Sequence, residues 1–123
     1  MGYESRIYIV DKTDIKGLTT KKKYAQLIAR FDMGVLTPLA YKFQNMPKTD
    51  CYVYADDGNT QIIEDKYGEE LTEASIAEVI AVLEKEVENG ENYRRIFPLL
   101  ATLKTLNEHK DQWKDLAVLH YGY

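Results

Sequence analysis

The apolar residues of this chain follow two spacings, and the order of the two limits what the chain can fold into. Between residues 3 and 64, short runs rich in tyrosine, isoleucine and valine are separated by turn-forming residues, which is typical of strands. From residue 72 to residue 106, apolar residues recur every three or four positions, which is typical of amphipathic helices. Because the strands come before the helices instead of alternating with them, we predict an α+β fold with an antiparallel sheet.

Five segments are predicted to be strands: residues 3–10, 23–33, 51–55, 60–64 and 116–121. The segment 11–20 is predicted to be a loop. Residues 23–33 also fit a helix, but a strand would pair naturally with the first one across the lysine-rich turn. Its alternation would place one set of side chains on a single face: Ala25, Leu27, Ala29, Phe31 and Met33. Asp56-Asp57-Gly58-Asn59 predicts a tight turn between the third and fourth strands, because Asp-Gly and Gly-Asn tolerate positive φ.

Two helices are predicted between the fourth and the fifth of these strands. Thr72 is expected to cap the first, which ends at Asn89-Gly90, since glycine suits the left-handed terminating position. The buried face of the first helix would be Ile76, Val79, Ile80, Leu83 and Val87, and that of the second Ile96, Leu99, Leu100, Leu103 and Leu106. Asn92 is a candidate cap for the second helix, and Pro98 either kinks that helix or begins it. Residues 39–43 suit one or two further helical turns.

These elements predict the order β-β-β-β-α-α-β in a single α+β domain over residues 1–123. An antiparallel sheet of about five strands would be covered on one face by the helix pair. A chain of 123 residues is the size of one domain. It contains no apolar stretch near the roughly 20 residues of a membrane span, and its first residues lack the pattern of a signal peptide. We therefore predict a cytoplasmic protein of the host cell, without a membrane partner.

Acidic residues are concentrated in one part of the chain. Residues 56–91 contain twelve of them against two lysines, a net charge of −10 within a chain whose net charge is −4. Such a field repels nucleic acid and attracts basic surfaces, so we expect a partner protein with a basic surface and no direct binding of nucleic acid. The block comprises Asp56, Asp57, Glu64, Asp65, Glu69, Glu70, Glu73, Glu78, Glu84, Glu86, Glu88 and Glu91.

Ten tyrosines are the second unusual feature. Tyr52 and Tyr54 would share one side of a strand that leads into two aspartates, and Tyr67 follows Asp65 closely. Acidic groups interleaved with aromatic rings suit a surface that holds Arg and Lys through ion pairs and cation–π contacts. Glu84, Glu88 and Glu91 follow one another at spacings of four and three residues, so they would share a face of the first predicted helix. The predicted partner-binding residues are Asp56, Asp57, Glu64, Asp65, Glu84, Glu88, Glu91, Tyr52, Tyr54 and Tyr67.

Catalytic and metal-binding patterns are weak. The chain has no glycine-rich phosphate loop and no His-Glu-x-x-His motif, and we expect neither a cofactor nor a metal site. Cys51 is the one cysteine, so an internal disulfide is excluded. Cys51 and His120 would make a nucleophile–base pair if they met, but a lone cysteine in an apolar strand is more often a small core residue. We favour a protein that is not an enzyme. A small-ligand-binding or enzymatic domain with a pocket near Cys51 and His120 is the alternative.

Four segments carry a resemblance: Met1-Gly-Tyr-Glu-Ser-Arg-Ile-Tyr-Ile-Val, Lys23-Tyr-Ala-Gln-Leu-Ile-Ala-Arg-Phe-Asp, Tyr54-Ala-Asp-Asp-Gly-Asn and Val118-Leu-His-Tyr-Gly-Tyr. They look like segments of small uncharacterised proteins of Gram-positive bacteriophages and prophages. The resemblance implies a compact product that binds a host or phage protein, and it supplies no catalytic residues. Inhibitors of bacterial immunity, among them anti-CRISPR proteins, are one group of that kind.

From charge, tyrosine content and this resemblance we expect a phage-type protein-binding module, an acidic inhibitor of a host nucleic-acid-handling or defence protein. A phage structural or assembly protein that self-associates through its tyrosines is a further alternative, so a homo-oligomer stays open.

Overall fold

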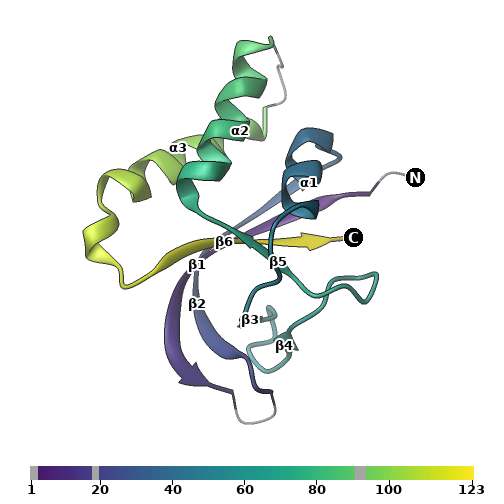
Figure 1. Ribbon diagram of the computed structural model, residues 1–123, viewed down its shortest axis with the longest axis vertical. Helices are drawn as coiled ribbons and strands as arrows, with labels where there is room; N and C mark the ends of the chain where they lie inside the picture. The colour runs from purple at the N-terminus through teal and green to yellow at the C-terminus, as the bar shows by residue number, and fades with distance from the viewer. Residues whose placement is uncertain (1–2, 18–19, 91–93) are drawn as a thin grey trace.

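The computed structural model describes residues 3–17, 20–90 and 94–123, and its α+β class confirms the prediction (Figure 1). Six strands form one sheet in the order β4-β3-β2-β1-β6-β5. The elements are β1 (Ser5–Lys16), β2 (Lys23–Gly34), α1 (Thr37–Gln44), β3 (Cys51–Tyr54), β4 (Gln61–Ile62), β5 (Thr72–Ala74), α2 (Ile76–Glu88), α3 (Ile96–Glu108), a 3-10 turn (Lys110–Gln112) and β6 (Leu116–Gly122).

The sheet is mixed, not antiparallel as predicted. β2 and β3 run parallel, with Lys23 opposite Cys51 and Tyr24 opposite Tyr52, while the other pairs are antiparallel. A parallel pair needs a crossover between its strands, and α1 provides it. The sequence indicated a helical turn or two at residues 39–43, but nothing local in it shows that the following strand returns in the same direction.

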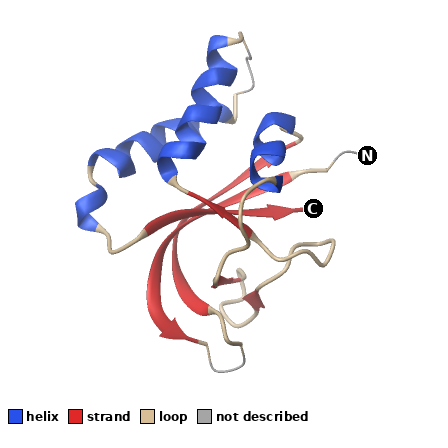
Figure 2. Ribbon diagram, viewed as in Figure 1, coloured by secondary structure: helices blue, strands red, loops and turns tan. Residues whose placement is uncertain are grey.

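The three helices pack on one face of the sheet (Figure 2). Their buried side chains join those of β1 and β6 in a helix-side core, which includes Ile7, Ile9, Phe43, Val79, Leu99 and Val118. The predicted faces of the helices are confirmed in most positions, since Ile76, Val79 and Leu83 of α2 and all five predicted residues of α3 are buried. Val87 is exposed instead, because it lies in the last turn of α2.

The face of the sheet opposite the helices is partly covered by the chain itself. The β1–β2 hairpin curls over, and β3 and β4 close the curl (Figure 1). A second, strand-side core fills it, comprising Tyr8, Val10, Ala25, Cys51, Val53, Leu71, Ala117 and Leu119. Successive residues of β6 therefore point into different cores, which is the alternation expected of a strand buried on both faces.

The prediction that alternate side chains of residues 23–33 share one face of the sheet is wrong, because the pairing of β2 with β1 is irregular. The register between β1 and β2 shifts between Ile9 and Val10, where Ala29 and Leu27 are the partners. One extra residue in a strand turns every later side chain to the other face. Ala25 consequently lies in the strand-side core, whereas Ala29, Phe31 and Met33 contact the helix-side core.

The start of the first long helix also differs from the prediction. Thr72 does not cap it but begins β5, where it pairs with His120 of β6. The cap is Ser75, whose hydroxyl accepts a bond from the Glu78 amide at 3.1 Å, while the Glu78 carboxylate accepts one from the Ser75 amide at 3.2 Å. This capping box needs a Glu or Gln three positions after the cap, which Ser75 has in Glu78 and Thr72 lacks. The predicted end at Asn89-Gly90 is confirmed, with Gly90 at a φ of 80°.

Two further boundaries differ. Residues 11–16 continue β1 instead of forming a loop, because β2 is long enough to pair with them as far as Lys16 and Lys23. Helix α3 begins at Ile96, so Pro98 neither begins it nor interrupts it. A proline in the first turn is tolerated because those amides have no partner within the helix. The candidate cap Asn92 lies outside the described residues.

In the described residues, no helix is both long and apolar enough to cross a membrane.

Candidate functional site

A pocket of about 660 Å³ opens between α1, the segment 64–72 and the C-terminal half of β6. Its walls include Tyr41 and Phe43 of α1, Tyr67 and Asp65 of the connecting segment, Tyr3 next to β1, and His120 of β6. The volume lies within the roughly 300–1,000 Å³ typical of ligand pockets. Side chains from four separate parts of the sequence therefore share one concave surface.

Local sequence explains how α1 presents its part of the wall. Pro38 lies in the first turn of the helix, where its missing amide costs nothing. Leu39 and Phe43, four residues apart, are buried on the core side, and Tyr41 is exposed on the other side. The chain after α1 is then fixed to β5 and to the residue before it by backbone bonds, from the Glu73 amide to the Pro47 carbonyl and from the Thr49 amide to the Leu71 carbonyl. These bonds hold α1 beside the segment that carries Asp65 and Tyr67.

Four aromatic rings form a continuous column along the pocket. The ring centroids of Tyr67 and Tyr3 are 5.5 Å apart, those of Tyr3 and His120 are 5.9 Å apart, and those of His120 and Phe43 are 5.0 Å apart. Each pair is stacked, with interplanar angles between 21° and 24°. The column runs from Phe43 in the helix-side core to Tyr67, which is exposed at the mouth.

His120 forms the base of the pocket and is neutral at physiological pH. Its side chain lines the cavity although only 5% of the residue is exposed. Burial lowers the pKa of His120 to about 4, and the negative charge of Asp65 offsets this only in part. One ring nitrogen, Nε2, lies 2.8 Å from the Ser5 hydroxyl. The other, Nδ1, forms no hydrogen bond with a described residue.

Asp65 organises the loop that carries Tyr67 to the mouth. Its Oδ1 accepts bonds from the amides of Tyr67 at 2.8 Å and of Glu69 at 3.1 Å, and Gly68 allows the turn with a φ of 78°. A bridge between Glu64 and Glu70 closes the base of this loop. Oδ2 of Asp65 forms no hydrogen bond within the described part of the chain. The loop is therefore rigidly held while one carboxylate oxygen stays open.

The mouth carries a negative field. Among the described residues, three acidic side chains line it, Asp65, Glu69 and Glu70, against one cation, Lys48. Lys48 lies 3.6 Å from Glu69, and Lys22, outside the pocket, lies 3.2 Å from Glu70. Asp65 forms no ion pair with a described residue. The pKa of Tyr3 is raised by burial and by the nearby charge of Asp65, which is consistent with a negative potential at this point.

Exposed apolar side chains gather around the same mouth. Tyr3, Val35, Tyr41 and Tyr67 all line the pocket, and each exposes more than two-fifths of its surface. Large apolar groups rimmed by charges mark interaction sites more often than single scattered ones do. The mouth of the pocket is thus a surface with both the shape and the composition of a binding site.

The turn acids and the tyrosines of β3 do not belong to this pocket. Asp56 is paired with Arg30 at 3.0 Å. Asp57 accepts hydrogen bonds from the Thr60 hydroxyl and from the amides of Thr60 and Asn59, which lower its pKa to about 2. Tyr52 and Tyr54 pack with Tyr24, with ring centroids 5.5–5.9 Å apart. Of the ten predicted residues, the structure brings Asp65 and Tyr67 to the pocket, and Glu64 lies at the base of their loop.

The helix acids are separated from the turn acids. Glu84 faces α3, where it pairs with Lys104 at 3.3 Å. Glu88 is the last residue of α2, at the end of that helix far from β3 and β4 (Figure 1). Glu91 lies outside the described residues. Within the acidic block, six residues form ion pairs with described lysines or arginines: Asp56, Glu69, Glu70, Glu73, Glu78 and Glu84.

Cys51 and His120 lie in different cores and do not meet. The Cys51 thiol is buried in the strand-side core, whereas the His120 ring stacks on Phe43 of the helix-side core. Burial raises the pKa of Cys51 to about 12, and the neighbouring Asp50 adds to this effect. The thiol is therefore protonated at neutral pH, and a thiolate nucleophile is not formed at this position.

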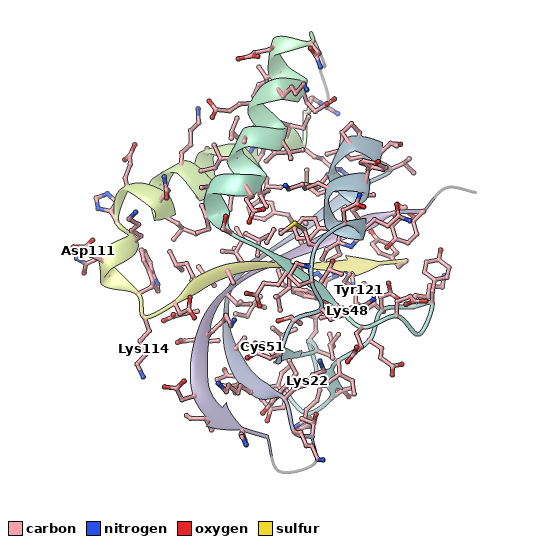
Figure 3. The ribbon with its side chains drawn as sticks, in the orientation of Figure 1. Lys22, Lys48, Cys51, Asp111, Lys114 and Tyr121 are labelled. Carbon is pink, nitrogen blue, oxygen red and sulfur yellow. The ribbon has the colours of Figure 1, made fainter. Side chains whose placement is uncertain are left out.

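One group of described residues has the donor atoms of a cation site, namely Asp50, Cys51 and Glu73, whose ligand atoms lie within 4.8 Å of one another. The ammonium of Lys12 contacts both carboxylates, at 3.3 Å from Asp50 and 3.1 Å from Glu73. Burial would lower the pKa of Lys12, but these contacts raise it. The chain's own cation thus fills this cluster, whose Cys51 is labelled in Figure 3. None of its residues lines the pocket.

Sequence reasoning missed Tyr3, Tyr41 and Glu69 as members of the site. Tyr3 and His120 are 117 positions apart in the sequence and stack because β1 pairs with β6 and β6 with β5. The available signal was local, in the sequence Asp65-Lys66-Tyr67 with two further acids behind it, and it identified the loop but not its partners.

Comparison with protein-family models, with curated proteins and with solved structures found no match. The function is therefore inferred from the geometry of the chain itself.

Proposed function

We propose that this chain is a protein-binding module whose pocket receives a positively charged segment of its partner. The observation that carries the proposal is the combination of an aromatic column with an acidic mouth in one cavity. Aromatic faces attract cations through their quadrupole, and carboxylates add charge complementarity. The four exposed apolar side chains at the mouth provide contact area that a free metal ion or small cation would not use.

The resemblance to phage proteins suggests which partner to examine first. A host nucleic-acid-handling or defence protein carries the basic surface that this pocket would bind, and occupation of that surface would inhibit it. The chain would then be an acidic inhibitor that acts through the pocket mouth, with Asp65 and Tyr67 in contact with the partner. The acids of the β3–β4 turn and of α2 would steer association by their field without forming the contact.

The first experiment titrates the ¹⁵N-labelled protein with a synthetic basic peptide, acetyl-Gly-Arg-Gly-Lys-Gly-Arg-Gly-amide, and follows amide shifts. We expect the largest shifts at Tyr67, Glu69 and His120, and weaker binding as salt is added, because exposed charges are screened. The same peptide with glutamates in place of the basic residues should not bind.

Two matched variants locate the contact. Asp65→Asn removes one charge but keeps the oxygen that caps the loop, and Glu88→Gln removes one charge at the end of α2. We expect at least fivefold weaker peptide binding for the first and a change of less than twofold for the second, because Glu88 adds only to the steering field. A larger loss for Glu88→Gln would move the contact to the helix and contradict the proposal.

A small-ligand-binding role is the second candidate. The volume of the pocket and the polar ring of the buried His120 among its lining residues favour it, although Cys51 is not part of the cavity. Under this alternative, small amines or aromatic cations would raise the melting temperature in a thermal-shift screen, whereas basic peptides would not.

A further inference from the structure

The chain already holds one of its own arginines with aromatic rings and a carboxylate. The guanidinium carbon of Arg6 lies 5.3 Å from the centre of the Tyr121 ring and 4.7 Å from that of Tyr123. Its Nε lies 2.6 Å from Oδ1 of Asp32. The register explains this Arg6 cluster, because Asp32 on β2 and Tyr121 on β6 both pair directly with Arg6 on β1.

The pocket contains the same kinds of groups without the arginine. Tyr3 and Tyr67 supply stacked rings at the mouth, and Asp65 supplies a carboxylate whose Oδ2 is not hydrogen-bonded within the described residues. Among the described lining residues the cation is Lys48, which is half exposed and is directed to Glu69. The neutral His120 at the base adds no positive charge at physiological pH.

From this correspondence we infer that the pocket selects an arginine side chain of the partner protein over a lysine. The inference rests on the proposed function and names the group that it recognises. A guanidinium is planar and weakly hydrated, so it stacks on a tyrosine face while its N–H groups donate to a carboxylate. A lysine ammonium is compact and strongly hydrated, and loses more by leaving water.

The arginine would stack on Tyr67 or Tyr3 and donate to Oδ2 of Asp65. The cavity of about 660 Å³ is larger than one side chain, so residues next to the arginine would also enter it. Val35 and Tyr41, which also line the pocket and are exposed, would contact these neighbours. This favours an arginine within a folded or extended protein segment as the source, and not a free guanidinium compound.

The test compares three peptides that differ at one position, acetyl-Gly-Leu-Xaa-Leu-Gly-amide with arginine, lysine or citrulline as Xaa. Citrulline keeps the planar shape and loses the charge. We expect the arginine peptide to bind at least fivefold more tightly than the lysine peptide and the citrulline peptide not to bind, as measured by amide-shift titration. Free N-acetyl-arginine amide should bind at least fivefold more weakly than the arginine peptide.

Variants assign the contacts. Asp65→Asn should weaken binding of the arginine peptide about tenfold, because a charge-assisted hydrogen bond is lost. Tyr67→Ala should weaken it about fivefold, whereas Tyr67→Phe, which keeps the ring, should not. Tyr54→Ala is the matched control, since Tyr54 is a partly exposed tyrosine outside the pocket.

The outcomes separate the two proposals. Equal binding of the arginine and lysine peptides overturns the inference and leaves the proposed function in place. Binding of neither peptide overturns both. Equal binding of the free arginine derivative and the peptide assigns the site to a small guanidinium compound, which contradicts a partner protein as the source.

Discussion

His120 and Tyr121 are neighbours on β6, yet they belong to two aromatic and acidic clusters on opposite faces of the sheet. Tyr121 contacts Arg6, which also binds Asp32, so the Arg6 cluster contains its own cation. His120 contacts Tyr3 in the pocket, where the Asp65 carboxylate forms no ion pair with a described residue. The difference shows that an acidic group beside tyrosines is paired with a cation of the chain in one place and is not paired with any described cation in the other.

The Lys12 cluster supports the same distinction. Asp50 and Glu73 are held by the Lys12 ammonium, and the Glu73 carboxylate also accepts a bond from the Thr49 hydroxyl at 2.7 Å. High local acidity is therefore not enough to identify a binding site in this chain. What distinguishes the pocket is that its carboxylates adjoin a cavity with exposed rings. Substitutions should consequently affect stability at the Arg6 and Lys12 clusters and binding at the pocket.

The largest effect is expected for Arg6→Ala. The change removes an ion pair with Asp32, two cation–π contacts and the packing of the arginine stem, and it should lower the free energy of unfolding by about 3 kcal/mol. Urea denaturation measures it. Arg6→Lys is the control, and it should recover less than half of the loss because an ammonium does not stack as a guanidinium does. A loss below about 1 kcal/mol for Arg6→Ala would show that the filled cluster is not stabilising.

The next largest effect is expected when the free energy of unfolding is measured against pH. This measurement should distinguish the two clusters, because the pocket contains a buried histidine and the Arg6 cluster contains none. The pKa of His120 is lowered by burial to about 4. Below pH 6.5 the unfolded chain binds a proton that the folded chain binds only near pH 4, so stability is constant above pH 6.5 and falls as the pH drops toward 4. Between pH 7 and pH 5 the loss should be about 2 kcal/mol.

The control for this titration is His120→Gln, which retains a polar atom near Ser5 but does not titrate. Its stability should be nearly constant between pH 7 and pH 5. Asp57, whose pKa is lowered to about 2, contributes at lower pH and does not disturb this window. Equal pH dependence of the two proteins would mean that His120 is protonated without cost in the folded state.

Gly122→Ala should disturb the pocket with a smaller effect on stability. A Cβ at this position would overlap the ring of Tyr3, which lies across Gly122. Because Tyr3 is partly exposed and can move, the expected cost in stability is about 1 kcal/mol, together with weaker binding of a basic peptide. A double-mutant cycle with Tyr3→Ala tests the cause, since Gly122→Ala should have little effect when the ring is absent.

Local features of this fold could be predicted, and features that depend on distant pairing could not. The turn at Gly58 and the helix end at Gly90 follow from residues that tolerate positive φ, and both are confirmed. The shift of register in β2 and the strand at Thr72 depend on which strand lies alongside, which no short segment encodes. The candidate site divides in the same way. Asp65 and Tyr67 were recognised as an acidic and aromatic pair, but their meeting with Tyr3 and His120 requires the pairing of β1, β6 and β5.

The smallest stability effect is expected for Asp65→Asn, and it is the most direct test of the comparison. An asparagine keeps the oxygen that accepts bonds from the amides of Tyr67 and Glu69, so the loop should retain its shape. No described cation loses a partner. The free energy of unfolding should therefore change by less than about 0.5 kcal/mol. The matched change Asp32→Asn in the Arg6 cluster removes a carboxylate that contacts Arg6 and Arg30, and should cost more than 1 kcal/mol. If both substitutions destabilise equally, the pocket carboxylate has a structural role and the distinction between a filled and an open cluster is lost.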